Sequence, residues 1–460
     1  MKSDDLHSIY FIGIGGIGMS ALARWFAARG KKVAGYDLRE TELTRKLAAE
    51  GMDIHFQEDI SLIPNSFKGQ KGTLIVYTPA VPGDHPELKF FKENNFNLKK
   101  RAEVLGDITK EHYTIAVAGT HGKTTTSSMI AHLINGISGG VNAFVGGIMA
   151  NYDSNLILGE EDAPIVVEAD EFDRSFLHIH PNYTVVTSID PDHLDIYGDE
   201  EGLAKTFLEF VERTPAKGRI LMSSEAGLKI FGPAYTSYDI RLGDIVAESL
   251  RIVEGAFVFT YRKGKIKVTD LFLYVPGYHN VLNALAAVTV ALEMGMSDKQ
   301  IRTRLKTYKG VKRRFEFVIR FGKTIVIDDY AHHPTEIAAI IRSVRVLYKK
   351  RYLTVVFQPH LFSRTRDFLE GFAESLDAAD DVILLPIYPA REKPIRGVTS
   401  ESIFELMENE KKMVCEKEEL LSVLEEKKPD LILTLGAGDI DKEVLKIAEF
   451  FKPKGGENEE

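Results

Sequence analysis

The chain has 460 residues, of which 44% are hydrophobic and 27% charged, and its formal net charge is −9. At roughly 150 residues per domain this length predicts about three domains, with the composition of an ordinary globular protein rather than a disordered or fibrous one. The acidic balance gives no general attraction for nucleic acid, so any phosphate group must be bound by local loops and helix ends. A single cysteine, Cys415, excludes an internal disulfide and a C-x-x-C metal pattern. With no export signal and no apolar stretch of roughly 20 residues, we expect a cytoplasmic protein without membrane insertion.

The first segment, residues 1–107, alternates predicted strands and helices. A buried strand over 7–14 is followed by apolar residues at helical spacing over 17–29, and further strands are expected over 32–37 and 73–80. This alternation is typical of a parallel α/β domain, so we expect a Rossmann-like fold here.

The second segment, residues 108–312, opens on another strand, 113–119, followed by a helix over 123–135. Between 236 and 276 the pattern changes to short alternating runs, with a hairpin turn expected at 262–265. We therefore expect a central α/β domain with antiparallel strands added to one side, and the phosphate loop described below makes this domain P-loop ATPase-like. Two helices should follow, before the basic junction that begins at Lys312.

The third segment, residues 313–460, alternates again. Strands are expected within FEFVIRF, TIVIDD, YLTVVFQ, DVILLPI and DLILTLG, with helices between them. The pattern predicts a C-terminal Rossmann-like domain, so the whole chain is expected to be a three-domain α/β protein.

A glycine-rich loop lies between the first strand and the first helix. It consists of Gly13, Ile14, Gly15, Gly16, Ile17 and Gly18, and Asp37 lies 19 residues after Gly18, at the end of the next strand. Such glycines allow a pyrophosphate to approach the backbone at a helix N-terminus, and the carboxylate can accept a ribose hydroxyl. The pattern predicts a diphosphate-containing nucleotide without identifying it. The alternative is a tight turn with no ligand.

A second phosphate loop begins the second domain. It contains Gly119, Thr120, His121, Gly122, Lys123, Thr124 and Thr125. Lys123 can reach terminal phosphates and the Thr124 hydroxyl can bind Mg²⁺, while the backbone amides hold phosphate oxygens. The loop departs from the strict Walker pattern, because Val117 stands where that pattern has glycine.

Acidic residues follow the next two strands of the same segment. Glu168, Asp170, Glu171 and Asp173 come after one strand, and Asp190-Pro191-Asp192-His193 after the other. Carboxylates at neighbouring strand ends beside a phosphate loop are typical of a Mg²⁺ site. We therefore expect Thr124 and Glu168 to be metal ligands, with a merely acidic loop as the alternative, whereas His193 is a less usual ligand for Mg²⁺.

These motifs together resemble the Mur ligases of cell-wall synthesis. The resemblance rests on GIGGIGMS, AVAGTHGKTTT, VVEADEFDRSF, SIDPDHLD, GYHNVLNALAA, GVKRRFE, DDYAHHPTE, FQPHLFSRTRD and YPAREKPIRGVTS, in this order over residues 8 to about 440. Within the family, the chain is most similar to the branch that adds L-alanine to UDP-N-acetylmuramate. The resemblance implies that the first loop binds the UDP pyrophosphate and the second binds ATP.

The resemblance also implies a reaction and its residues. The lactyl carboxylate of UDP-N-acetylmuramate would attack the ATP γ-phosphate, and L-alanine would capture the resulting acyl phosphate. Lys123, Glu168, His193 and Arg314 match the catalytic positions, with His193 also implied as a metal ligand beside Thr124 and Glu168. Arg314 would reach the ATP phosphates across a domain boundary. His279, Asn280 and Asn283 would lie near the adenine, although Asn280 can also serve as a helix cap. Tyr330, His332, His360 and Arg364 would bind the amino acid, although His332 and His333 can also cap the helix that begins near Pro334.

Two departures from the family pattern and three rival functions remain open. Leu361 stands where some relatives have arginine, and the segment 151–159 differs from the usual pattern after Gly146 and Gly147, so no sugar-nucleotide contact is assigned to it. Several Mur ligases carry a carbamylated lysine near the position of Lys205, which we interpret as a solvent-facing residue. The rivals are a murein peptide ligase that attaches tripeptide to the same nucleotide, an NAD-binding dehydrogenase, and a non-catalytic nucleotide-binding regulator.

Overall fold

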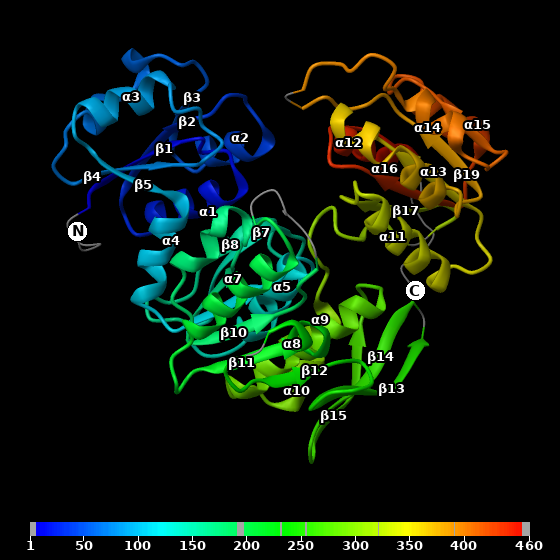
Figure 1. Ribbon diagram of the computed structural model, residues 1–460, viewed down its shortest axis with the longest axis horizontal. Helices are drawn as coiled ribbons and strands as arrows, with labels where there is room; N and C mark the ends of the chain where they lie inside the picture. Colours follow the sequence, from blue (N-terminus) through cyan, green and yellow to red (C-terminus); the bar gives the residue numbers. More distant parts are fainter. Residues whose placement is uncertain are drawn as a thin grey trace. The chain divides into compact units, whose positions relative to one another are not determined.

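The computed structural model describes residues 6–190, 197–230, 232–253, 255–320, 322–390 and 392–452. The chain divides into two compact units. One comprises residues 1–274 and 278–309, and the other comprises residues 275–277 and 310–460. Three sheets, each flanked by helices, make up these units (Figure 1). The predicted fold class, with α/β layers at both ends and a mixed central layer, is confirmed. The domain limits at 107 and 312 stay predictions.

The first sheet is parallel and has the strand order β3-β2-β1-β4-β5. Its strands are β1 (Ser8–Ile12), β2 (Lys32–Tyr36), β3 (Asp53–His55), β4 (Thr73–Tyr77) and β5 (Asn97–Lys100). Its helices are α1 (Ile17–Ala28), α2 (Glu42–Ala49), α3 (Pro86–Glu93) and α4 (Arg101–Lys110), with short 3₁₀ turns at Ile60–Leu62 and Asn65–Phe67. All of β1 is buried, as expected for a central strand covered on both faces.

The second sheet of the described chain has the order β15-β14-β13-β12-β11-β10-β6-β9-β7-β8. Its strands are β6 (Thr114–Ala118), β7 (Asn142–Met149), β8 (Ser154–Ile157), β9 (Ile165–Glu168), β10 (Tyr183–Val186), β11 (Arg219–Ser223), β12 (Thr236–Tyr238), β13 (Ile245–Val253), β14 (Ala256–Lys263) and β15 (Ile266–Leu273). Its helices are α5 (Lys123–Ile134), η4 (Phe172–His178), α7 (Glu200–Glu212), α8 (Ser224–Lys229), α9 (Tyr278–Glu293) and α10 (Asp298–Thr307).

The added strands of this sheet are antiparallel from β13 onward, with the β14–β15 turn at the predicted place. The expectation was wrong for β12, which pairs in parallel with β11 and β13. The short run 236–238 carries no alternation that distinguishes the two directions, so only its partners decide the pairing.

The third sheet has the order β16-β17-β21-β18-β19-β20, and only the β16–β17 pair of its described strands is antiparallel. Its strands are β16 (Glu316–Ile319), β17 (Ile325–Asp329), β18 (Leu353–Phe357), β19 (Asp381–Leu384), β20 (Lys412–Val414) and β21 (Leu431–Leu435). Its helices are α11 (Pro334–Leu347), α12 (Phe362–Asp367), α13 (Leu369–Leu376), α14 (Ser400–Leu406), α15 (Leu420–Lys427) and α16 (Ile440–Phe451).

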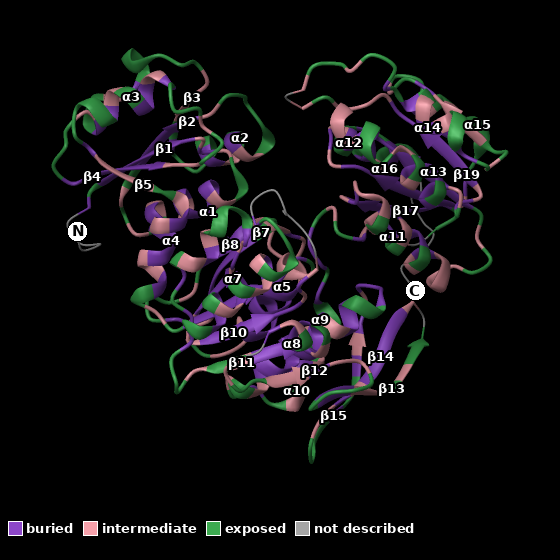
Figure 2. Ribbon diagram, viewed as in Figure 1, coloured by how far each residue is buried: buried purple, intermediate pink, exposed green. Residues whose placement is uncertain are grey.

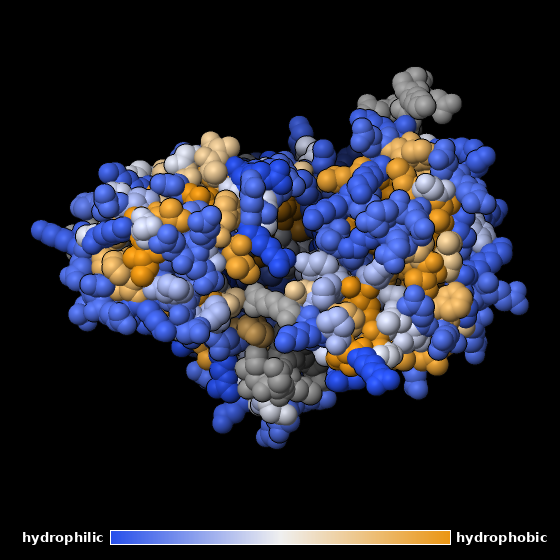
Figure 3. Space-filling model, turned by 90° about the horizontal axis from the view of Figure 1, so that it is seen from above, coloured by the Kyte–Doolittle hydropathy of each residue, from blue (hydrophilic) through white to orange (hydrophobic). Residues whose placement is uncertain are grey.

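Buried strands form the core of each layer, drawn in purple in Figure 2, whereas many helix faces are exposed. In the first unit one apolar cluster runs from α1 into the second sheet, where the Trp25 and Phe144 rings lie 5.2 Å apart. On the face seen in Figure 3, hydrophilic side chains surround separate apolar groups. In the part of the chain that is described, no helix is both long and apolar enough to cross a membrane.

Candidate active site

The first glycine loop joins β1 to the N-terminus of α1, as the sequence predicts. The Gly15 amide donates to Asp37 Oδ2 at 2.7 Å, which brings the predicted carboxylate to the loop. A Cβ on Gly15 would lie 2.9 Å from that same oxygen, so glycine is required for this approach. Gly16 is the N-cap of α1, and no side chain caps its free amides. The loop therefore presents backbone donors at the positive end of a helix.

Arg101 lies over this loop and was not identified from the sequence. A Cβ on Gly18 would be 2.7 Å from the Arg101 Nη1 atom, which places the guanidinium at the first turn of α1. Its other amino group, Nη2, lies 3.9 Å from Asp170 Oδ2, and the Arg101 side chain is 25% exposed. Within the described ranges this side chain makes no hydrogen bond, so its donors are open to an anion. A lone arginine at the start of a helix carries no motif that could have revealed this role.

The second glycine loop joins β6 to α5. Gly122 is the N-cap of α5 and has a left-handed backbone with φ 80°, a conformation that favours glycine. The loop is held from the strand end after β10, where the Ser188 hydroxyl accepts from the His121 amide at 2.8 Å and pairs with the Thr120 hydroxyl at 2.9 Å. The structure thus orders the predicted phosphate loop against the neighbouring strand.

Lys123 turns back onto its own loop. Its ammonium donates to the Gly119 carbonyl at 2.6 Å and to Glu171 Oε1 at 2.8 Å. Glu171 is 1% exposed, and burial raises its pKa, whereas the nearby Lys123 charge lowers it. The Lys123–Glu171 contact was not predicted, because Glu171 was indistinguishable from the other acidic residues of its segment.

Thr124 and Glu168 meet beside this loop. The Thr124 hydroxyl donates to Glu168 Oε1 at 2.8 Å, and the Gly146 amide donates to Glu168 Oε2 at 2.7 Å. Both oxygen donors suit Mg²⁺, so the residues present fit that ion. The third predicted ligand, His193, lies outside the described residues. Among the residues that are described, no cluster of three or more His, Cys, Asp or Glu side chains has the arrangement of a metal site.

The expected adenine-side residues lie at the start of α9, which packs against α5. The Asn283 amide donates to Asn280 Oδ1 at 3.1 Å, and Asn283 Oδ1 lies 3.0 Å from the position of a Cβ on Gly122. The structure therefore brings Asn280 and Asn283 to the second loop. His279 is exposed on the first turn of the helix. Lys205, on α7, is also exposed.

In the second unit the four predicted amino-acid residues gather at the carboxyl ends of β17 and β18. Ring centroids are 5.2 Å apart for Tyr330 and His332, and 6.0 Å apart for His332 and His360. The pKa of His360 is lowered to about 4, mainly by burial and further by the nearby His332 and Arg364. This imidazole is therefore neutral at pH 7. Arg364 has no ion-pair partner in the described part of the chain, which leaves its guanidinium available to a carboxylate.

Arg314 and the helix cap complete this region. The Arg314 guanidinium lies 5.6 Å from the centroid of the Tyr330 ring. His333, rather than His332, is the N-cap of α11, since its side chain accepts from the Thr335 amide. His332 instead contacts the Tyr330 carbonyl through Nδ1 at 2.9 Å. The capping role considered for both histidines therefore applies to one of them.

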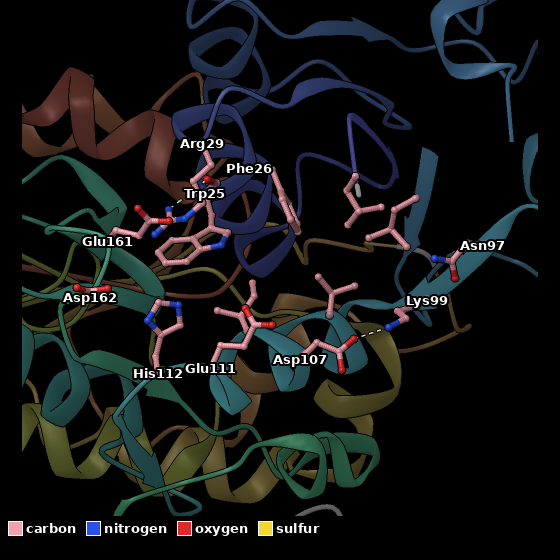
Figure 4. Close-up of a pocket in the computed structure, with 14 residues that line it drawn as sticks. Trp25, Phe26, Arg29, Asn97, Lys99, Asp107, Glu111, His112, Glu161 and Asp162 are labelled. Carbon is pink, nitrogen blue, oxygen red and sulfur yellow. Dashed lines mark hydrogen bonds and ion pairs between the residues drawn. The ribbon is translucent and has the colours of Figure 1, made fainter. Parts of the chain in front are cut away.

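A cavity of about 270 Å³ lies at the opposite, amino end of the first sheet. Figure 4 shows the Trp25 indole between Arg29 and His112, with Glu111, Glu161 and Asp162 nearby. None of the residues predicted from sequence to bind a ligand lines it. The cavity is thus separate from both phosphate loops.

Three family descriptions match consecutive parts of the chain. These are "Mur ligase family, catalytic domain" over residues 8–113, "Mur ligase middle domain" over 117–291 and "Mur ligase, glutamate ligase domain" over 313–438. The UDP-N-acetylmuramate–L-alanine ligase of Christiangramia forsetii is 47% identical over 439 residues, covering 95% of this chain and 96% of that protein. The protein of the same name from Phocaeicola vulgatus is 45% identical over 463 residues, covering 99% and 100%.

Solved structures agree with these relatives. The crystal structure of UDP-N-acetylmuramate-alanine ligase from Thermotoga maritima is 28% identical with a TM-score of 0.81, covering 97% of this chain and 99% of that one. A murein peptide ligase from Psychrobacter arcticus, 22% identical with a TM-score of 0.67 and covering 98% and 100%, shares the fold. The predicted resemblance is confirmed, and the chain belongs to the Mur ligase family.

Proposed function

We propose that this chain is an ATP-dependent ligase that joins L-alanine to the lactyl carboxylate of UDP-N-acetylmuramate in peptidoglycan precursor synthesis. The observation that carries the proposal is identity of 45–47% over nearly the whole chain with proteins of that name. In the reaction a carboxylate oxygen bonds to the γ-phosphorus and ADP leaves. The L-alanine nitrogen then bonds to the acyl carbon, and phosphate leaves. Since both substrates and ATP are cytosolic metabolites, we place the protein in the cytoplasm.

The UDP diphosphate binds the first loop through Gly13, Gly15, Gly16 and Gly18. Asp37 already accepts the Gly15 amide and can accept a ribose hydroxyl through its second oxygen. We add Arg101 to this set, because its guanidinium stands at Gly18 without a hydrogen bond in the described chain. A planar fork of donors suits a diphosphate, which offers oxygens in pairs.

ATP binds the second loop through Gly119 to Thr125, with Asn280, Asn283 and His279 on the adenine side. To bind ATP, the Lys123 ammonium must leave Glu171 and the Gly119 carbonyl and contact the terminal phosphates instead. The flexible side chain of lysine allows this movement. A carboxylate that attacks a triphosphate brings two anions together, so fixed cations must offset their repulsion. Lys123 and Arg314 serve this purpose, with Arg314 acting from the third domain.

Mg²⁺, when bound, would supply further charge neutralisation at the γ-phosphate. Thr124 and Glu168 would hold it, because their oxygens already lie 2.8 Å apart beside the loop. We include His193 as the third ligand on family grounds. The Gly146 amide fixes the second Glu168 oxygen, so the carboxylate keeps its orientation.

L-Alanine binds the third domain, for which we propose the limits 313–460, beside a first domain of 1–107 and a central domain of 108–312. Arg364 pairs with the alanine carboxylate, while Tyr330, His332 and His360 line the side of the amine. The low pKa of His360 keeps its imidazole uncharged at neutral pH, which avoids repulsion between an imidazolium and the ammonium group of the incoming alanine.

The test is phosphate release by the purified protein with UDP-N-acetylmuramate, L-alanine, ATP and Mg²⁺. We expect release only when all four are present. Release with the tripeptide but not with L-alanine would assign the chain to murein peptide ligation instead. Reduction of NAD without any phosphate release would assign it to the dehydrogenases. Glycine and serine in place of alanine measure selectivity, where one methyl group contributes about 1–3 kcal/mol.

A further inference from the structure

The hairpin of β7 and β8 touches both phosphate sites. Residues 151–159, which include β8, differ from the family pattern, so no sugar-nucleotide contact was assigned to them from the sequence. In the structure β7 and β8 pair antiparallel, with Phe144 opposite Leu156 and Met149 opposite Ser154. Each strand of the hairpin makes polar contacts, and the contacts of the two strands lead to different glycine loops.

On the ATP side, β7 fixes the carboxylate that faces the loop. The Gly146 amide donates to Glu168 Oε2 at 2.7 Å, while the Thr124 hydroxyl donates to the other oxygen at 2.8 Å. A Cβ on Gly146 would lie 2.6 Å from Oε2, so the strand approaches the carboxylate as closely as a glycine permits. Glu168 ends β9, and β7 therefore helps to fix the orientation of its carboxylate.

On the UDP side, Asn155 of β8 makes hydrogen bonds to the first turns of α1. The Asn155 side chain is fully buried. Its Nδ2 donates to the Ile17 carbonyl at 2.5 Å and to the Ser20 hydroxyl at 2.9 Å, and its Oδ1 accepts from Arg24 Nη1 at 2.9 Å. A buried amide with three partners has one strongly preferred orientation, and losing it leaves buried polar groups unpaired.

These contacts matter because the two nucleotide substrates are proposed to bind at different sheets. Under the proposed function the diphosphate of one substrate binds at the α1 N-terminus, and the γ-phosphate of the other binds at the α5 N-terminus. Their reacting atoms must approach to about 3–3.5 Å, and a displacement of about 1 Å can cost a factor of 10² in rate. Since the hairpin contacts both α1 and the Glu168 carboxylate, it is one of the elements that set the separation of the two sites.

We infer that Asn155 is a positioning residue that aligns the lactyl carboxylate with the ATP γ-phosphate by holding α1 against β8. The inference rests on the proposed function. It assigns Asn155 to the first chemical step, formation of the acyl phosphate, rather than to the binding of either nucleotide or to amide formation.

The experiment compares Asn155→Ala with Asn151→Ala in the full-length protein. Asn151 lies on the same hairpin, but its amide donates to the Thr307 carbonyl at 2.8 Å and its oxygen accepts from the Lys309 amide at 2.8 Å. It is thus a matched asparagine that holds the end of α10 instead of α1. Ser20→Ala removes one Asn155 partner and serves as a milder second variant in case Asn155→Ala folds poorly.

Acyl phosphate formation is measured without alanine, by trapping with hydroxylamine as the hydroxamate. We expect Asn155→Ala to reduce trapping and overall kcat by the same factor, at least about tenfold. Calorimetric Kd values for each nucleotide should stay within about threefold, because every backbone donor of both loops is retained. Ser20→Ala should show a smaller loss in the same step, and Asn151→Ala should match the wild type.

Other outcomes would refute the inference. Trapping by Asn155→Ala within twofold of the wild type overturns it, as does an equal loss in Asn151→Ala. A rise in the Kd for UDP-N-acetylmuramate with unchanged trapping at saturation would show a binding role instead. Absence of any hydroxamate with the wild type would overturn the proposed function, and this inference with it.

Discussion

Glu87 provides a quantitative test of the structure, through the stability of the first domain. This glutamate lies in α3 with its side chain 0% exposed, and it accepts a hydrogen bond from the Tyr10 hydroxyl at 2.8 Å. His55 Nε2 is 3.3 Å from its other oxygen. Burial, which outweighs the Tyr10 hydrogen bond, raises the pKa of Glu87 from 4.5 to about 7. The folded protein therefore holds this proton at pH values where the unfolded chain has lost it.

The sign of the effect follows from linkage. Because the pKa of Glu87 is raised in the folded state, its bound proton stabilises the folded protein fully below pH 4.5. This stabilisation is lost as the pH rises toward and through 7. The interval between 4.5 and about 7 corresponds to roughly 3 kcal/mol of unfolding free energy. Glu87→Gln keeps an oxygen acceptor for Tyr10 but cannot ionise. Relative to the wild type, the variant should gain about 2–3 kcal/mol in unfolding free energy between pH 5 and pH 8.

The chain itself supplies the reporter for this measurement. Trp25 is the only tryptophan and lies in α1, with its ring against Phe144 of the second sheet, so urea unfolding followed by tryptophan fluorescence reports on the first unit. Glu93→Gln, on the exposed face of the same helix, is the matched control for replacing a glutamate by glutamine. If the difference between Glu87→Gln and the wild type is the same at pH 5 and pH 8, Glu87 is not the buried titrating group described here.

Three further predictions concern the ligands. Lys123→Ala should lower kcat by a factor of about 10² or more while calorimetry shows UDP-N-acetylmuramate binding unchanged; loss of both with the fold preserved would contradict separate phosphate sites. Arg101→Met should raise the Kd for UDP-N-acetylmuramate by about 10- to 100-fold, because it removes a charge-assisted contact, and leave ATP binding intact. An equal loss of ATP affinity would place Arg101 at the other loop. Arg364→Met should raise the KM for L-alanine by about tenfold or more yet retain hydroxylamine trapping, and loss of trapping would move Arg364 from the amino-acid site to the first chemical step.

The elements that the sequence revealed are those with local signatures. Both glycine loops lie between a strand and a helix, where the spacing of Gly13 to Gly18 and of Gly119 to Thr125 predicted them. The conformation that makes them work is also local, since Gly122 needs only its own backbone to adopt a positive φ. Predictions of this kind depend on a few consecutive residues, so they hold regardless of how the rest of the chain packs around them.

The elements that the sequence did not reveal depend on partners far along the chain. Asn155 contacts α1 across more than a hundred residues, and Arg101 meets Gly18 and Asp170 from the start of a helix with no motif. Nothing in the letters around these residues distinguishes them from solvent-facing asparagines and arginines. Their roles are set by packing between layers, which only the three-dimensional arrangement provides.

Three of the four cations assigned to ligands, Lys123, Arg101 and Arg364, differ in a way that matches what each is proposed to bind. Lys123 is satisfied internally, by Glu171 and the Gly119 carbonyl, whereas Arg101 and Arg364 make no side-chain hydrogen bond among the residues described. A lysine carries a compact charge on a flexible stem, so it can leave one set of acceptors and follow a phosphoryl group during transfer. An arginine presents a rigid fork, which is most useful for an anion that must keep one orientation. In the proposed function the diphosphate and the alanine carboxylate have to stay fixed while the γ-phosphate moves. Each of the first two is then bound by an arginine, whereas the flexible Lys123 joins Arg314 at the third.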